Sequence, residues 1–116
     1  EAKKTITRSS GWSAARRNHI QRNPYCAACG SKRMLQVHHI MPFHEDPSLE
    51  LDPNNLITLC IYKDCHVEIG HGGNYKCYNP EVKQIAQDLL CGKINRHAAE
   101  LACRAARKAN DGNKLT

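Results

Sequence analysis

The sequence predicts a small α+β domain whose centre is stabilised by a four-cysteine zinc site and whose two ends are helical. Two cysteine pairs, Cys26-Ala-Ala-Cys29 and Cys60-Ile-Tyr-Lys-Asp-Cys65, bracket segments with the composition of short strands. The chain has 116 residues, a length typical of one domain whose limited core benefits from a metal. We therefore expect a single domain over residues 1–116, with a core at about 24–76, a basic N-terminal helix at about 11–22 and a C-terminal helical extension at about 79–110.

The first expected element is a helix from Trp12 to about Arg22. Asn23-Pro24 ends it, because proline disfavours a helical conformation of the residue before it. The residues expected to face inward are Trp12, Ala15 and Ile20. Arg16, Arg17 and Arg22 then lie on exposed faces, where they either contact DNA or form an ordinary solvated surface.

Two short strands and a short helix are expected in the centre of the chain. Residues 35–40 have the composition of a strand, and residues 56–59 form a second strand that leads into Cys60. A loop rich in proline and aspartate joins the two strands. After Cys65 we expect a short helix that ends at Gly70.

Two further helices are expected in the C-terminal third of the chain. Asn79 is a suitable N-cap and Pro80 a suitable first helical residue, so the first of these helices runs from there to about Cys91. The second is predicted from Asn95 to Ala109. The apolar residues expected to pack together or against the zinc-bound centre are Ile85, Leu89, Ile94, Ala98 and Leu101.

The net charge of +6 is unevenly spread along the chain. Residues 1–36 carry +7, residues 37–76 carry −4 and residues 77–116 carry +3. Basic ends around a slightly acidic centre suit a polyanion such as nucleic acid, although a basic protein surface without such a partner has the same composition. The residues expected to contact DNA are Arg16, Arg17, Arg22, Lys32 and Arg33. No apolar run reaches the roughly 18 residues of a membrane span, so no membrane partner is expected.

Four cysteines are the expected ligands of a structural Zn²⁺: Cys26, Cys29, Cys60 and Cys65. Short cysteine spacings of this kind suit a tetrahedral thiolate site. Paired cysteines without an evident secretion signal favour a reducing compartment. The alternatives are four reduced and buried cysteines, one accidental disulfide, or Cys77 in place of one ligand. Cys77, Cys91 and Cys103 are otherwise expected to act as small hydrophobic residues.

Two adjacent histidines, His38 and His39, lie between the cysteine pairs. Successive residues of a strand point to opposite faces, so one of the two is expected to face a metal and the other a water or a substrate phosphate. His66 directly follows Cys65, so the zinc site fixes its position and the hairpin brings it near His38. A lone histidine is usually structural, whereas this combination indicates a catalytic metal site.

These residues resemble the HNH endonuclease family, which has the ββα-metal, or His-Me finger, fold. The likeness covers residues 12–80 and is closest to the small zinc-containing members found in phages and bacteria. The segments that carry it are Cys26-Ala-Ala-Cys29-Gly30, Val37-His38-His39-Ile40-Met41-Pro42-Phe43, Asp52-Pro53-Asn54-Asn55-Leu56-Ile57-Thr58-Leu59-Cys60 and Cys65-His66.

The resemblance implies a role for each residue that matches the motif. His38 matches a metal ligand, and His39 matches the general base that deprotonates the attacking water. Asn55 matches the central asparagine, which braces the loop between the strands and helps to orient the base. His66 matches the final metal ligand on the helix.

The sequence departs from the family pattern in two spacings. The second cysteine pair is stretched to four intervening residues, and His71 lies five residues after His66 instead of the four seen in some members. A five-residue step moves off one face of an α-helix. His71 is therefore a candidate third ligand only if Gly70 breaks the helix.

The resemblance implies a metal-dependent DNA endonuclease, which nicks or cuts both strands by hydrolysis of phosphodiester bonds with one catalytic divalent ion. The expected cofactors are structural Zn²⁺ and catalytic Mg²⁺ or Mn²⁺, with other divalent ions as substitutes. The expected partners are duplex DNA and either a second copy of the chain or a targeting protein, in the cytoplasm of a bacterial or phage-infected cell. The alternatives are a non-catalytic zinc-ribbon DNA-binding module and a zinc-stabilised protein-interaction domain.

Overall fold

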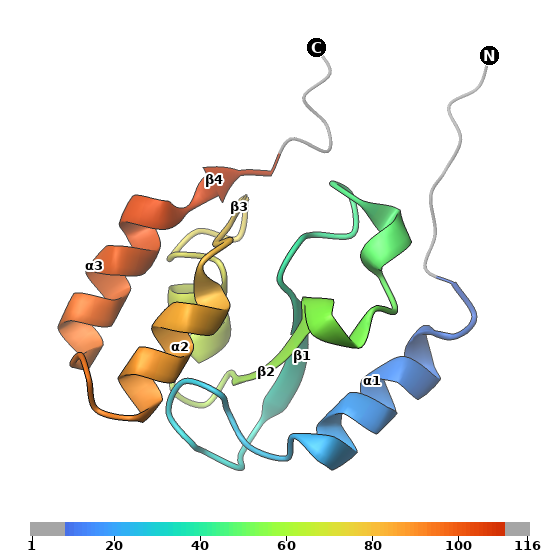
Figure 1. The fold of residues 1–116 in the computed structure, drawn as a ribbon, viewed down its shortest axis with the longest axis horizontal. Coiled ribbons are helices and arrows are strands. Elements are labelled where there is room, and N and C mark those ends of the chain that lie inside the picture. The colour runs from blue at the N-terminus through green and yellow to red at the C-terminus, as the bar shows by residue number, and fades with distance from the viewer. Residues whose placement is uncertain (1–8, 111–116) are drawn as a thin grey trace.

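A two-stranded antiparallel sheet forms the centre of the structure, a computed structural model that describes residues 9–110 (Figure 1). Strand β1 (Leu35–His39) pairs with β2 (Leu56–Cys60), with Leu35 opposite Cys60 and His39 opposite Leu56. The loop between the strands contains two 3₁₀ turns, Pro47–Leu49 and Pro53–Asn55, each opened by an aspartate side chain that accepts a backbone hydrogen bond. Both predicted strands are confirmed, to within one residue.

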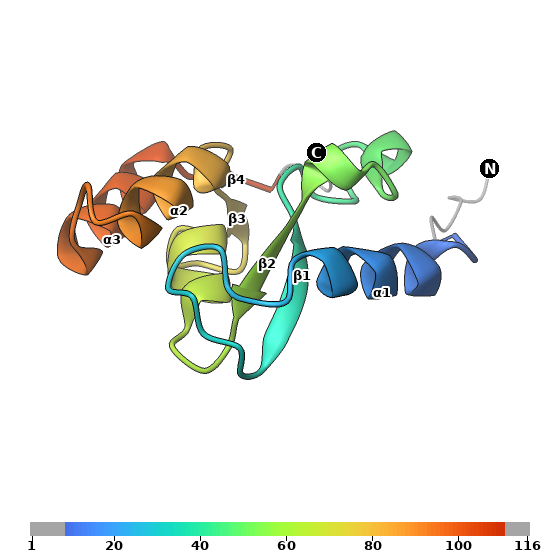
Figure 2. The same cartoon turned by 60° about the horizontal axis from the view of Figure 1, so that its bottom comes forward.

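Helices cover the sheet from opposite sides. Helix α1 (Trp12–Arg22) lies on one side, and α2 (Val82–Leu90) and α3 (Arg96–Ala106) lie together on the other, as Figures 1 and 2 both show. The predicted bounds of α1 are confirmed. Its buried residue is His19, whereas the residues expected to face inward, Trp12, Ala15 and Ile20, are only half-buried.

A short π-helical turn, His66–Gly70, follows the second cysteine pair. The amide of His71 donates to the carbonyl of His66, five residues earlier, at 3.1 Å. The prediction of a short helix that ends at Gly70 is confirmed, but the turn is π-helical and not α-helical. The turn instead takes up one additional residue by changing its hydrogen-bond pattern.

The C-terminal helices differ from their predicted bounds. Helix α2 begins at Val82 and not at Pro80, because Asn79 forms a tight turn in which its side chain accepts from the amide of Glu81 and donates to the carbonyl of Ile69. Helix α3 does begin after an Asn95 cap, whose side chain accepts from the amide of Ala98. It ends at Ala106, where the prediction placed Ala109. Residues Lys108–Ala109 form β4, which pairs antiparallel with β3 (Cys77–Tyr78).

The hydrophobic core lies between the sheet, the π-helical turn and the two C-terminal helices. Its fully buried members include Leu59, Ile69, Val82, Ala86, Ala99 and Cys103. Ile85, Leu89 and Ile94 pack against it as expected. The expectation for Ala98 and Leu101 is wrong, because α3 turns Ala99 and Cys103 inward and leaves those two residues exposed. None of the helices formed by residues 9–110 is long and apolar enough to span a membrane.

Candidate functional site

Four cysteine sulfurs meet at the end of the central hairpin. Cys26 and Cys29 come from the turn before β1, Cys60 ends β2, and Cys65 precedes the π-helical turn. The four sulfur atoms lie within 4.8 Å of one another, and the Sγ atoms of Cys29 and Cys60 are 3.6 Å apart. Three of the four residues have no solvent exposure. A buried tetrad of thiols at this separation suits a tetrahedral Zn²⁺.

Backbone amides donate hydrogen bonds to two sulfur atoms of the tetrad. The amide of Ala28 donates to Cys26 Sγ at 3.4 Å, and the amide of Lys63 donates to Cys60 Sγ at 3.4 Å. A hydrogen bond from the Cys65 thiol lowers the pKa of Cys26 to about 4, while the same bond and burial raise the pKa of Cys65. Burial also raises the pKa of Cys29, so a bound zinc ion would have to displace the protons of the remaining thiols.

The three other cysteines lie outside this cluster. Cys103 is buried in the core, Cys91 is exposed, and Cys77 lies in β3. Cys77 is therefore not among the four residues that the fold brings together. Its backbone contributes elsewhere, since its carbonyl accepts a hydrogen bond from His71 Nδ1 at 2.8 Å.

Three histidines form a second cluster on the face of the sheet that packs against the π-helical turn. His38 Nδ1 lies 3.0 Å from His66 Nε2, and each ring of His38, His66 and His71 is about 5 Å from the other two. One nitrogen atom from each residue lies within 4.8 Å of the others. Nitrogen ligands at about 2.0–2.1 Å from one ion are about 3–3.4 Å apart, so these side chains fit a shared divalent ion.

Hydrogen bonds to two of the rings select the nitrogen that faces the cluster. His66 Nδ1 donates to the side-chain oxygen of Gln36 at 2.9 Å, and His71 Nδ1 donates to the carbonyl of Cys77. In a neutral imidazole the other nitrogen then carries the lone pair. Nε2 of both residues is consequently the ligand atom, in the arrangement that metal-binding histidines usually have.

The π-helical turn explains how His71 joins His66. On an α-helix, residues five apart are separated by about 140° around the axis. A π-turn closes a hydrogen bond to the residue five positions later and so brings that residue close to the face of the first. The wider turn therefore brings His71 to the same face as His66, which the sequence spacing alone argued against.

Burial keeps this cluster neutral. It is the main cause of a pKa well below the usual range for His38, a pKa of about 4 for His66 and a lowered pKa for His71. Neighbouring imidazoles lower the pKa of His38 and His66 further. Three neutral rings at pH 7 offer lone pairs to a cation without first losing protons.

His39 lies on the opposite face of β1, as strand alternation predicts. Its ring stacks on Trp12 of α1 at 4.6 Å, and its Nε2 lies 3.0 Å from the backbone carbonyl of Glu50. A carbonyl oxygen only accepts, so Nε2 carries the proton and Nδ1 is the basic nitrogen of the neutral ring. The side chain is 9% exposed, so its orientation is fixed by the packing around it.

Asn55 braces the loop that supplies this carbonyl. Its side-chain oxygen accepts from the amide of Met41 at 2.8 Å, and its side-chain nitrogen donates to the carbonyls of Met41 and Leu49. Leu49 precedes Glu50, so Asn55 is linked through the loop backbone to His39. Asn55 itself is buried, and its described side-chain hydrogen bonds all go to the loop backbone.

His38 and His39 reach one pocket although they point to different faces. The pocket has a volume of about 240 Å³ and is lined by Val37, His38, His39, Pro42, Phe43, His44, His66, His71 and Asn110. It therefore combines the three-histidine cluster with the ring fixed by Glu50. Larger pockets elsewhere on the described part of the chain contain neither group.

Comparison with known families connects this geometry to a function. Residues 25–72 match the family model described as HNH endonuclease. This segment, called the HNH domain below, is similar to that family. It contains both cysteine pairs, Asn55 and the four histidines predicted from the sequence to form the site, which are His38, His39, His66 and His71. Searches of curated proteins and of solved structures found no match.

The match associates the HNH domain with nuclease and DNA-binding function. Helix α1 and the two C-terminal helices lie outside the matched residues. The matched segment does include both strands of the sheet and the π-helical turn in that order. The chain thus carries an HNH segment within a small α+β structure.

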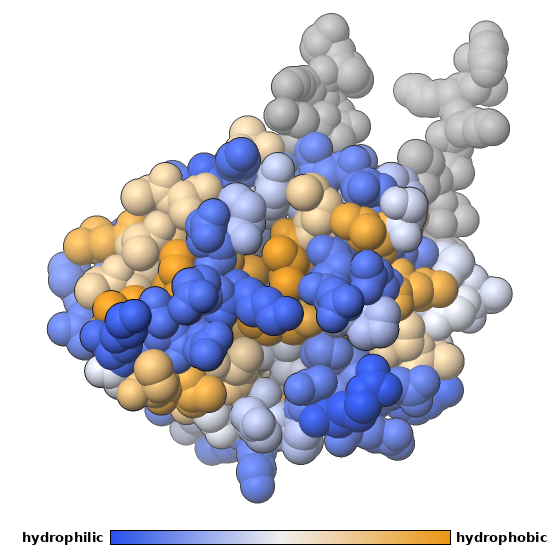
Figure 3. Space-filling view, viewed as in Figure 1, coloured by the Kyte–Doolittle hydropathy of each residue, from blue (hydrophilic) through white to orange (hydrophobic). Residues whose placement is uncertain are grey.

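The basic residues expected to contact DNA are all exposed. Arg16, Arg17 and Arg22 lie on α1, over which Figure 3 shows strongly hydrophilic residues, and Lys32 and Arg33 lie in the turn before β1. The guanidinium of Arg33 lies 4.2 Å from the centre of the Tyr62 ring. None of the five contributes to the pocket of the HNH domain.

Several residues that shape the HNH domain were not singled out from the sequence. Gln36 had a usable signal, because it lies two residues before His38 and therefore on the same face of β1. Tyr75, which is 66% exposed, places its ring 5.0 Å from His71 at the edge of the cluster. The carbonyls of Glu50 and Cys77 carried no signal, because any residue type can supply a backbone oxygen.

Replacing Gln36 with leucine is expected to weaken divalent-ion binding by about 10–100-fold, the usual effect of losing an outer partner of a metal ligand. His66 would lose the acceptor that fixes its Nδ1 proton. Calorimetric titration of zinc-loaded protein with Co²⁺ measures the change, with Gln84→Leu on α2 as the matched control. An affinity equal to that of the wild type would show that Gln36 does not orient His66.

Proposed function

We propose that this protein is a metal-dependent DNA endonuclease that hydrolyses phosphodiester bonds, with His39 as general base. The observation that carries the proposal is the shared pocket, in which a three-histidine cluster lies beside a histidine whose basic nitrogen is fixed. Hydrolysis of a phosphodiester needs both a proton acceptor for water and neutralisation of phosphate charge. The HNH domain supplies residues suited to both needs.

His39 acts on the attacking water. Its Nε2–H is held by the carbonyl of Glu50, so Nδ1 accepts the proton as the water oxygen bonds to phosphorus. The bond from phosphorus to the 3′ oxygen then breaks, which leaves a 5′-phosphate and, after protonation of the leaving oxygen, a 3′-hydroxyl. Stacking on Trp12 and the loop braced by Asn55 hold the ring in this orientation.

His38, His66 and His71 hold the catalytic ion. When bound there, a divalent ion would neutralise charge on the scissile phosphate and on the departing oxygen. Three imidazoles suit Mn²⁺, Ni²⁺ or Zn²⁺ better than Mg²⁺, which prefers oxygen ligands. Cys26, Cys29, Cys60 and Cys65 hold a separate structural Zn²⁺ that fixes the hairpin end and the start of the π-helical turn. The two ions therefore have different ligands and different roles.

Exposed cations outside the pocket hold the substrate. The arginines of α1 and the basic turn at Lys32 and Arg33 suit contacts with backbone phosphates of duplex DNA. Such contacts position the duplex without reading its bases, so cleavage has little sequence preference unless a targeting protein supplies it. A second copy of the chain would turn nicking into cleavage of both strands.

A non-catalytic zinc-ribbon DNA-binding module is the second candidate. The observation that favours it is the burial of His39, which stacks on Trp12 as a structural histidine would. This candidate predicts salt-sensitive DNA binding without cleavage under any divalent ion. It leaves the assembly of three neutral histidines around one pocket without a purpose.

Cleavage of supercoiled plasmid tests the proposal. Zinc-loaded protein is incubated with plasmid and Mg²⁺ or Mn²⁺, with an EDTA control and with the His66→Ala variant. We expect metal-dependent nicking that the variant loses, because it removes one of three ligands. His97→Ala, at an exposed position of α3, is the matched control and should cleave like the wild type. Equal cleavage by the two variants would rule out the histidine cluster as the catalytic centre.

A further inference from the structure

The segment from Lys63 to Gly72, both included, is here named the ligand segment and contains Cys65, His66 and His71. Two candidate metal sites thus depend on a stretch of ten residues. Its π-helical turn is only five residues long, too short to be stable without outside contacts. Of the described elements outside the HNH domain, α3 makes the most contacts with the π-helical turn of the ligand segment, followed by α2.

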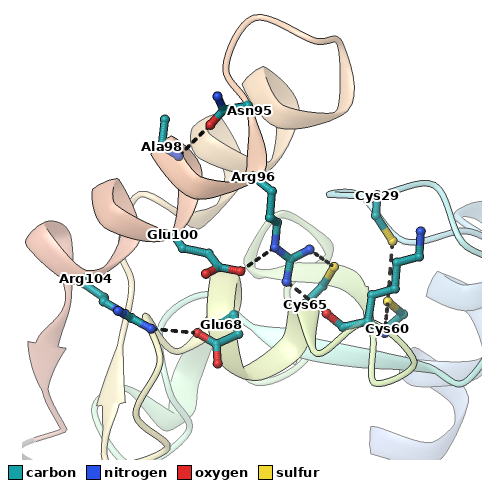
Figure 4. Close-up of polar contacts among 10 residues, drawn as sticks. Cys29, Cys60, Cys65, Glu68, Asn95, Arg96, Ala98, Glu100 and Arg104 are labelled. Carbon is teal, nitrogen blue, oxygen red and sulfur yellow. Dashed lines mark hydrogen bonds and ion pairs between the residues drawn. The ribbon is translucent and has the colours of Figure 1, made fainter.

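Arg96 grips the first end of the ligand segment. Figure 4 shows its guanidinium directed at Cys65, to whose Sγ its Nη1 donates at 3.2 Å. Its Nη2 donates to the carbonyl of Lys63 at 2.9 Å, and its Nε donates to Glu100 on the same helix at 2.7 Å. The residue between Lys63 and Cys65 is Asp64, whose φ of 58° lies in the left-handed region. Arg96 therefore fixes a strained backbone and a zinc ligand together.

Arg107 grips the other end of the ligand segment. Its Nη1 donates at 2.8 Å to the carbonyl of Gly72, the residue that directly follows His71. The approach is so close that a Cβ on Gly72 would lie 2.8 Å from Arg107 Cβ and 2.8 Å from the carbonyl oxygen of Cys103. Gly72 also has a φ of 65°, so glycine is required there for two reasons.

The chain beyond Arg107 supports the same histidine by a second route. Residues Lys108–Ala109 form β4 and pair with β3, which contains Cys77. The carbonyl of Cys77 accepts the Nδ1 proton of His71. The residues that follow α3 thus support His71 in two ways: Arg107 holds the backbone next to it, and β4 pairs with the strand whose carbonyl accepts from its imidazole.

We propose that α3 and the residue directly after it position the histidine site, with Arg96 at the start of the helix and Arg107 just beyond its end holding the two ends of the ligand segment. The inference rests on the proposed function and adds to it residues outside the matched HNH domain. Arg104 provides a natural comparison, because it lies on the same helix and contacts the same segment. Its ion pair with Glu68 is long, at 3.4 Å, and the arginine side chain is 51% exposed, so it contributes little.

The test is a Co²⁺ titration of zinc-loaded protein, followed by absorbance and calorimetry, on Arg107→Gln, Arg107→Lys and Arg104→Gln. We expect Arg107→Gln to weaken Co²⁺ binding at the histidine site by about 10-fold, as loss of an outer partner does. Arg107→Lys keeps the aliphatic stem and one donor, so it should restore most of the affinity. Arg104→Gln should bind like the wild type. In plasmid cleavage, Arg107→Gln should lower kcat and leave KM nearly unchanged.

Arg96 is tested at the cysteine site. Arg96→Gln should release zinc to a colorimetric chelator severalfold faster than the wild type, because Cys65 loses a charged hydrogen-bond donor. Release at the rate of Arg104→Gln would remove Arg96 from the proposal.

Each further outcome is decisive. If Arg107→Gln and Arg104→Gln bind Co²⁺ equally, α3 does not position the histidines. If Arg107→Gln loses its circular dichroism spectrum or its zinc, Arg107 serves the whole fold and the local role is wrong. If Arg107→Gln weakens Co²⁺ binding while the wild type never cleaves DNA, the positioning role holds and the nuclease assignment fails.

Discussion

Replacing His39 with alanine is expected to lower the rate of DNA cleavage by about 10²–10⁴-fold, the usual contribution of a general base. The imidazole lines the pocket, and the carbonyl of Glu50 holds its Nε2–H, which leaves Nδ1 as the basic nitrogen. Removing it leaves the attacking water without a positioned proton acceptor. The measurement is the initial rate of plasmid nicking at saturating Mg²⁺.

The control for this variant is metal binding. His39 is outside the three-histidine cluster, so the affinity of the zinc-loaded protein for Co²⁺ should stay near that of the wild type. The variant also loses stacking on Trp12, which is expected to cost about 0.5–1.5 kcal/mol of stability. A thermal unfolding experiment measures this loss. Loss of cleavage together with loss of Co²⁺ binding would contradict the assignment of His39 as a base acting separately from the metal ligands.

Replacing Cys60 with serine is expected to unfold the protein. Structural zinc contributes about 10–16 kcal/mol of apparent binding free energy in small zinc domains. Globular domains have a total stability of about 5–15 kcal/mol, so the loss of one buried thiolate is more than this chain can offset. Cys60 ends β2 and has no solvent exposure, so its ligand position cannot be filled by water without disrupting the hairpin. Zinc content and circular dichroism give the answer.

Cys91→Ser is the matched control for this change. Cys91 is exposed at the end of α2 and lies outside the sulfur cluster, so its replacement should leave zinc content and thermal stability near the wild-type values. A Cys60→Ser protein that keeps its fold and binds no zinc would show that the hydrophobic core alone suffices. In that case the four cysteines would be ordinary buried residues.

The central hairpin was predictable from sequence because its signals are local and agree with one another. Strand composition, the two cysteine pairs and the turn residues each place β1 and β2 within one residue of their observed bounds. The C-terminal third was less predictable, since Asn79 has the residue type of a helix cap but is used to bind the carbonyl of Ile69. Likewise, the last residues predicted to be helical form β4, whose partner β3 lies about thirty residues earlier in the chain.

The candidate site was predictable as a set of side chains but not as a set of orientations. His38, His39 and His66 could be named because residue type and spacing carry that information. The proton on each ring depends on Gln36, the carbonyl of Glu50 and the carbonyl of Cys77, which reach the rings through tertiary structure. Arg96 and Arg107 were hidden for the same reason, because nothing in a basic helix indicates which part of the chain its arginines will meet.

The π-helical turn between His66 and Gly70 changes what a spacing rule means for this kind of site. A chain with one residue fewer in this turn would present the same pair of imidazoles from an ordinary α-helical turn. Insertion or deletion of a single residue here thus leaves the two imidazoles on the same face, provided that a glycine stays at the position of Gly70, which packs against His38 and Leu59. Relatives whose turn differs in length by one residue would therefore be compatible with an unchanged metal site. A sequence search that requires a fixed number of residues between the two histidines would overlook such relatives.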